Sequence, residues 1–153
     1  MGRWVHGKGE LSIQDLISRI KDKPNFFQAG ALALFIGVVR GVHTEGRVTK
    51  LKLEAYEEGA DAALEKICRD LRSGKGIVDV QIHHFLGEFT AGEDLVYVGV
   101  AGAHRREVFT TLLEAVERYK REAPIFKKET LETGKSYWVS ESGAEHGGSE
   151  SGL

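Results

Sequence analysis

The feature that most constrains the fold is a stretch from Phe26 up to Arg40 that carries no charged side chain. Within it, Ala29 to Val39 is almost continuously apolar and rich in Val, Ile, Leu and Phe, which is typical of a strand buried on both faces. Gln28 interrupts the stretch, which is shorter than the ~20 residues that a membrane-spanning helix requires. We therefore expect a strand in a protein core and no membrane partner.

The composition predicts one globular domain followed by a short tail. The chain has 153 residues, within the roughly 100–200 residues of a typical domain. Residues 140–153 contain four Ser, four Gly and three Glu but no Lys or Arg, a composition that favours a flexible, solvated tail. We expect a single domain over residues 1–139 and an acidic tail over residues 140–153. Without the tail, the formal net charge changes from −2 to +1.

These properties exclude several classes of protein. Residues 1–8 lack the apolar stretch of a secretory signal, so a cytoplasmic location is expected. The nearly neutral domain offers no basic stripe, so we expect no nucleic-acid partner. The single cysteine, Cys68, excludes an internal disulfide, and its place on an apolar helical stripe indicates a core residue rather than a nucleophile. His83 and His84 are adjacent and would face opposite ways in a strand, so we expect no metal site. No cofactor is expected.

Hydrophobic periodicity predicts an α+β fold. We expect helices after Ser12, over 59–72 and over 104–121, the last ended by Pro124, because the residue before a proline is pushed out of the helical region. Residues 48–56 are expected to pair with the first strand in a hairpin, and further strands are expected over 77–85, 95–101, 125–132 and 136–139. The predicted architecture is an α+β sandwich, with a mostly antiparallel sheet packed against two main helices on one face.

Two lysine positions could carry chemistry. The apolar stripe of the last helix, which includes Phe109 and Val116, leads to Lys120, so this side chain is expected beside the apolar face. Lys120 is then either a partly desolvated amine or a surface lysine that complements the helix dipole. Lys127 and Lys128 follow in a predicted strand, where one of them should point inward unless both belong to a solvated strand end.

Two further positions favour an anion. Arg105 and Arg106, after His104, lie in the first turn of the last helix, where cations oppose the helix dipole unless an anion is present. Alternatively, the two arginines pair with acidic neighbours. Arg40 ends the apolar strand beside Gly41 and is suited to hold a phosphate or carboxylate through two hydrogen bonds, or else to pair with a glutamate at the rim.

Taken together, these motifs resemble the large, catalytic subunit of molybdopterin synthase. The resemblance runs from about Ala31 to Trp138, and its most specific part is the order and spacing from His104 to Glu129, with two lysines seven residues apart around a proline. It rests on these segments: residues 35–40 (FIGVVR), 53–56 (LEAY), 83–88 (HHFLGE), 92–93 (GE), 98–101 (VGVA), 103–105 (AHR), 119–129 (YKREAPIFKKE), Gly134 and Trp138.

The resemblance implies a sulfur transfer. The family converts cyclic pyranopterin monophosphate, also called precursor Z, into molybdopterin by installing a dithiolene. Its sulfur arrives as a thiocarboxylate on the C-terminal Gly-Gly of a small ubiquitin-like subunit. The family assembles as a homodimer of large subunits with one small subunit at each end, a heterotetramer. By resemblance the catalytic residues are Lys120 and Lys127, and the substrate-binding residues are Val38, Val39, Arg40, His104, Arg105, Lys128 and Glu129.

A second interpretation is open at this point. The same cations would suit a non-catalytic α+β module that binds a phosphorylated metabolite or an acidic peptide tail. Both hypotheses predict anion binding, whereas only the synthase predicts turnover and a ubiquitin-like partner. We expect the cations at positions 40, 104, 105, 127 and 128 to share one pocket in either case.

Overall fold

The computed structural model describes residues 2–140 and 145–146 and confirms the α+β class. The helices are α1 (Ile13–Lys21), the 3-10 helix η1 (Pro24–Gln28), α2 (Glu57–Arg72) and α3 (Arg105–Glu122). The strands are β1 (Val5–Gly7), β2 (Ala31–Val38), β3 (Val42–His43), β4 (Gly46–Ala55), β5 (Ile77–Phe89), β6 (Asp94–Gly102), β7 (Ile125–Leu131), β8 (Ser136–Ser140) and β9 (Glu145–His146).

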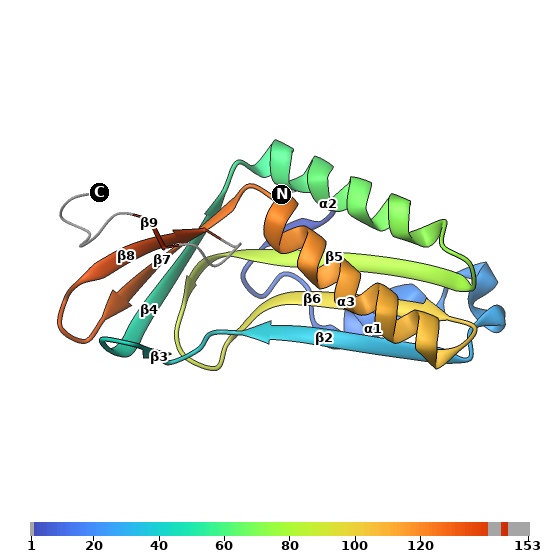
Figure 1. The fold of residues 1–153 in the computed structure, drawn as a ribbon, viewed down its shortest axis with the longest axis horizontal. Coiled ribbons are helices and arrows are strands. Elements are labelled where there is room, and N and C mark those ends of the chain that lie inside the picture. The colour runs from blue at the N-terminus through green and yellow to red at the C-terminus, as the bar shows by residue number, and fades with distance from the viewer. Residues whose placement is uncertain (1, 141–144, 147–153) are drawn as a thin grey trace.

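These strands form one sheet in the order β2-β6-β5-β4-β7-β8-β9. Neighbours along this path are antiparallel, while β1 adds to β5 in parallel and β3 pairs with β4. Figure 1 shows β2, β6 and β5 as the long part of the sheet, with β4, β7 and β8 at one end. The site described below lies where these two parts meet.

The two main helices pack side by side on one face of the long strands, as expected (Figure 1). A Cβ at Gly102 would meet Val108 of α3, whereas one at Gly99 would meet Ile20 of α1. Residues three apart in a strand face opposite ways, so α1 covers the other face. Ser12 caps α1 through a hydrogen bond from the Asp15 amide.

The first apolar strand occupies a different place in the sheet from the one that its sequence predicts. It forms β2, which is an edge strand rather than a strand buried on both faces, and Ile36 and Val38 are 42% and 51% exposed. The expected hairpin with residues 48–56 is wrong, because β2 pairs with β6, and β4 pairs with β5 and β7. Only the short β3 folds back on β4, through a turn in which Gly46 has φ +142°.

The last part of the chain follows its pattern more closely. Strands β7 and β8 pair as expected, and α3 ends at Glu122, immediately before Ala123 and Pro124. Strand β8 extends one residue past the expected domain boundary at residue 139, and Glu145–His146 pair with β8 as β9. The rest of the predicted tail lies outside the described residues, so its flexibility remains a prediction.

A row of buried polar side chains runs along one face of β5. The His6 Nε2 lies 2.8 Å from the His83 Nδ1, the His83 Nε2 lies 2.8 Å from the Gln81 Oε1, and the Gln81 amide donates to the Asp79 carboxylate at 2.9 Å. Lys23 closes the row with an ion pair to Asp79. Burial lowers the pKa of His83 to about 3. The row thus joins β1 to the core while His83 stays neutral.

Within the described residues, no helix is long and apolar enough to cross a membrane. The same residues contain no group of three or more His, Cys, Asp or Glu side chains that could hold a metal ion. Cys68 is buried in α2, and desolvation raises the pKa of its thiol to about 12.

Candidate functional site

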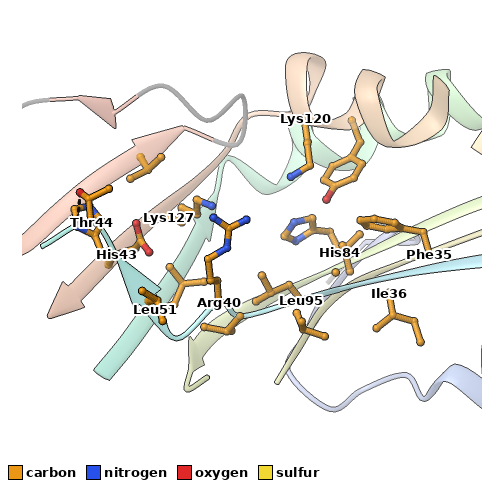
Figure 2. Close-up of a pocket in the computed structure, with 18 residues that line it drawn as sticks. Phe35, Ile36, Arg40, His43, Thr44, Leu51, His84, Leu95, Lys120 and Lys127 are labelled. Atoms are coloured by element: carbon orange, nitrogen blue, oxygen red, sulfur yellow. Dashed lines mark hydrogen bonds between the residues drawn. The ribbon is translucent and has the colours of Figure 1, made fainter. Parts of the chain in front are cut away.

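A cavity of about 780 Å³ opens where the long strands meet β4 and β7, and we call it the main cavity. Residues from α3, from strands β2 to β8 and from the segments that follow β2 and β3 line it. They are residues 35–40, Val42, His43, Thr44, Leu51, His84, Leu95, Val96, Tyr119, Lys120, Lys127, Glu129 and Val139. Figure 2 shows the nitrogen atoms of Arg40, Lys120 and Lys127 directed toward a common space.

Arg40 reaches the main cavity because β2 is irregular at its end. The pairing register with β6 shifts between Gly37 and Val38, and such a bulge bends a strand and redirects the side chains that follow. The next residue is then fixed on both sides, since the Val39 amide donates to the Glu93 carbonyl and the Val39 carbonyl accepts from the Gly92 amide, both at 2.9 Å. Val38 and Val39 also line the cavity.

Strand β7 delivers Lys127 and Glu129 to the main cavity on one face. Successive side chains alternate across a strand, so Lys128 lies on the opposite face, where its Nζ is 5.8 Å from the centre of the Trp138 ring. The expectation that one of the two lysines points inward is therefore met by Lys127. The structure therefore does not bring Lys128, a predicted substrate-binding residue, to the main cavity.

Lys120 lies in the last turn of α3 and reaches the main cavity beside Tyr119. Its Nζ is 5.6 Å from the centre of the Tyr119 ring, within the range of a cation–π contact. Tyr119 is buried, at 2% exposure, and its ring makes an edge contact with His84 at a centroid distance of 5.7 Å. The apolar stripe of α3 thus places Lys120 at the border between core and cavity, as its spacing predicts.

His84 is a cavity residue that the sequence interpretation missed. The His84 amide donates to the Trp4 carbonyl at 2.9 Å, and its Nδ1 lies 3.1 Å from the Phe85 carbonyl. A carbonyl only accepts, so Nδ1 carries the proton. Figure 2 shows the imidazole between Arg40 and Phe35. The sequence interpretation assigns neither of the adjacent histidines at 83 and 84 to a site, although alternation along a strand predicts that the two face opposite sides of the sheet.

The turn between β3 and β4 forms one wall of the main cavity. The His43 ring stacks on Tyr137, with centroids 5.0 Å apart and planes inclined by 11°. Glu45 accepts a hydrogen bond from the Tyr137 hydroxyl at 2.7 Å, which lowers the pKa of that carboxyl, as does nearby Lys135. These contacts fasten Thr44 and its neighbours to β8.

His104 and Arg105 lie elsewhere. With Gly30, Ala31, Ala103, Arg106 and Phe109 they line a separate open hollow at the start of α3, which we call the α3 hollow. From Arg105 to Lys120 the helix rises about 22 Å at 1.5 Å per residue. The expectation of a single pocket for all the cations is therefore wrong within one chain, because the long helix that carries both groups keeps them apart.

The main cavity can hold a small anion with polar and ring parts. Arg40, Lys120 and Lys127 supply positive charge, Glu129 supplies a hydrogen-bond acceptor, and Phe35 and Leu95 supply apolar surface. Two primary amines from different elements can also move protons. The described residues of the cavity offer no cysteine nucleophile, since Cys68 is buried in α2.

Comparisons with known proteins identify the relatives of this chain. Residues 6–122 match the family model described as MoaE protein. A probable molybdopterin synthase of Haloferax volcanii is 37% identical over 131 residues, which cover 84% of this chain and 50% of that protein, so the chain spans half the length of this relative. A molybdopterin synthase catalytic subunit of a Nostoc species is 35% identical over 140 residues, covering 90% of this chain and 82% of that protein.

Solved structures share the fold. The molybdopterin synthase of Staphylococcus aureus superposes with a TM-score of 0.80 at 25% identity, covering 92% of this chain and 98% of that chain. A complex of subunits 1 and 2 of the molybdopterin-converting factor from Helicobacter pylori superposes with a TM-score of 0.68 at 21% identity, covering 84% of this chain and 85% of that chain. The latter likeness concerns the fold alone.

Proposed function

Because this chain belongs to the MoaE family of molybdopterin synthase catalytic subunits, an enzyme of molybdenum cofactor biosynthesis, we propose that its main cavity is the site of sulfur transfer. There it converts precursor Z into molybdopterin as a sulfurtransferase. The observation that carries this proposal is the convergence of Arg40, Lys120 and Lys127, from three separate elements, on one cavity. A phosphorylated pterin is an anion, and because the overall charge of the domain is close to neutral, the positive charge that binds it must be concentrated locally.

The proposed roles follow from the position of each group. Arg40 binds the phosphate, since a guanidinium can donate two parallel hydrogen bonds to it. Lys120 mediates proton transfer beside the entering sulfur donor, and Lys127 stabilises the negative charge that develops. Glu129, Val38 and Val39 contact the substrate from the walls. Lys128, on the other face of β7, is not part of this proposal.

The sulfur donor is the C-terminal thiocarboxylate of a small ubiquitin-like subunit. The Helicobacter pylori complex contains two subunits of the molybdopterin-converting factor, which supports a protein partner for this chain. The chain has no accessible thiol of its own for a sulfur relay, because its single cysteine is buried. Sulfur carried in by a partner's Gly-Gly tail removes the need for one.

A homodimer would bring the separated cations together. Ile36 and Val38 of the edge strand β2 are exposed. Phe109 and Leu113 of α3 are also exposed, at 63% and 64%. A second copy that covers this apolar surface could place its His104 and Arg105 in the main cavity of the first. With one small subunit on each copy, the assembly is a heterotetramer.

The direct test combines the purified chain, precursor Z and the thiocarboxylated small subunit and measures molybdopterin. We expect product, and we expect Lys120→Ala and Lys127→Ala each to slow its formation by a factor on the order of 10² while keeping the thermal unfolding temperature of the parent. Lys128→Ala is the matched control. Product formation by folded Lys120→Ala and Lys127→Ala at the parental rate would refute the assignment.

The shared site has its own test. At precursor Z concentrations well below saturation, Arg40→Ala and Arg105→Ala are each expected to lose most of the activity. Mixing the two after dissociation should restore about a quarter of the parental activity, because half of the dimers become heterodimers with one intact site each. Absence of any recovery in verified heterodimers would exclude His104 and Arg105 from the partner copy's cavity.

A further inference from the structure

Tyr119 stands between the proposed proton-transfer residue and the core. It is buried at 2% exposure, yet it lines the main cavity, and it precedes Lys120 in the last turn of α3. The Lys120 Nζ is 5.6 Å from the centre of its ring. The face of an aromatic ring carries partial negative charge and attracts a cation within about 6 Å of its centroid.

The ring is itself held in place from below. His84 contacts it at an angle of 64° between the ring planes. The His84 backbone is fixed between two strands, opposite Val5 in β1 and opposite Val96 in β6, and its imidazole is oriented by the Phe85 carbonyl. The flexible Lys120 side chain, with its four-carbon stem, thus contacts the Tyr119 ring, which packs on a rigid, buried part of the sheet.

We propose that Tyr119 is a positioning residue for the reaction: its ring face holds the Lys120 ammonium at the wall of the main cavity, and His84 fixes the ring. This inference rests on the proposed function, since it requires Lys120 to take part in the chemistry. It predicts that the π face, and neither the hydroxyl nor the volume of Tyr119, matters for turnover.

Tyr119→Leu and Tyr119→Phe separate these properties. The leucine fills apolar space without a π face, and the phenylalanine keeps the face without the hydroxyl. For Tyr119→Leu we expect kcat for molybdopterin formation to fall about 3- to 30-fold with KM for precursor Z within about twofold. For Tyr119→Phe we expect kcat within about twofold of the parent.

Loss of a buried aromatic residue also reduces stability, so a matched control is needed. Tyr97 is equally buried, at 6% exposure, and its ring makes an edge contact with Phe85, but it does not line the main cavity. We expect Tyr97→Leu to lower the unfolding temperature at least as much as Tyr119→Leu while leaving kcat within about twofold of the parent.

A double-mutant cycle decides whether Tyr119 acts through Lys120. In a Lys120→Ala background, measured by the residual product in long incubations, adding Tyr119→Leu should change the rate less than twofold. An undiminished effect in that background would overturn the inference, and so would a Tyr119→Phe variant as slow as Tyr119→Leu or a Tyr119→Leu variant as fast as the parent. Full activity of Lys120→Ala alone would instead refute the proposed function.

Discussion

Lys127 and Lys128 are neighbours in β7, yet only Lys127 lines the main cavity, while the Lys128 Nζ lies against the Trp138 ring on the opposite face of the sheet. The two side chains have the same charge, the same length and almost the same place in the sequence. They therefore form a natural pair for separating the chemistry of the cavity from the general charge of the strand.

We expect Lys127→Ala to lower the single-turnover rate of molybdopterin formation by a factor on the order of 10², a typical loss for one charge-stabilising group. Lys128→Ala should change it less than threefold, because that ammonium is directed away from the cavity. Rapid-quench measurement at saturating precursor Z compares the two. Equal losses for both variants would contradict the assignment of faces.

Arg40 is expected to dominate binding of the phosphate. Arg40→Ala should weaken the affinity for precursor Z roughly 10- to 100-fold, the value of a charge-assisted hydrogen-bonded pair. Arg40→Lys keeps the charge but loses the planar fork, so it should recover only part of this loss. Isothermal titration with precursor Z measures both. Full recovery by Arg40→Lys would show that charge alone, without the fork, accounts for binding.

The buried histidine in β5 makes stability depend on pH. Burial lowers the pKa of His83 from its ordinary value of 6.5 to about 3 in the folded chain. Below pH 6.5 the unfolded state binds a proton that the folded state excludes, so the free energy of unfolding falls as pH decreases, by at most about 1.4 kcal/mol per pH unit for this residue, until about pH 3.

Urea unfolding between pH 7 and 4 measures this slope. His83→Gln retains an amide that can bond with its neighbours in the row but cannot titrate, so its slope should be shallower than that of the parent. His6, whose pKa is also lowered by burial, would still contribute. An identical slope in His83→Gln would mean that other groups set the acid sensitivity.

Two glycines near the ends of the main helices should respond in opposite ways to alanine. A Cβ at Gly102 would lie 2.8 Å from the Gly76 carbonyl oxygen and 2.9 Å from Val108 of α3, so Gly102→Ala should cost about 1–3 kcal/mol. A Cβ at Gly59 in α2 would meet the ring of Tyr56, which is 65% exposed and can turn away. Gly59→Ala should be neutral or stabilise by up to about 1 kcal/mol, because alanine favours helix. Denaturant midpoints for both variants test this contrast.

Features that depend only on neighbouring residues could be predicted from the sequence. The helical stripe leading to Lys120, the stop at Pro124 and the alternation of Lys127 and Lys128 are local, and the structure agrees with them. The pairing of β2 with β6 is not local, because it joins segments more than 50 residues apart. Predicting it requires knowing which strand forms the edge of the sheet. The same apolar pattern is expected for a central strand and for an edge strand whose exposed residues pack against another protein surface.

The site was predictable in composition but not in extent. The expected cavity residues Arg40, Lys120, Lys127 and Glu129 do meet, whereas His104 and Arg105 lie at the other end of α3. The helix predicted over 104–121 already separates Arg105 from Lys120 by about 22 Å at 1.5 Å per residue, so this division could be deduced from the sequence. His84 and Tyr119 could not be assigned to the cavity from the sequence. Both occupy positions that an apolar core residue would fill, and only the cavity beside them reveals a second role.

The buried thiol of Cys68 has a consequence for the cell's response to oxidants. A thiol with no exposed surface and a pKa of about 12 has almost no thiolate at physiological pH, and thiolate is the form that peroxides and alkylating agents attack. Since the sequence holds no other cysteine, we expect the thiol chemistry of this subunit to be insensitive to oxidative stress. Thiol-based redox control of the reaction would then have to act on a component other than this subunit.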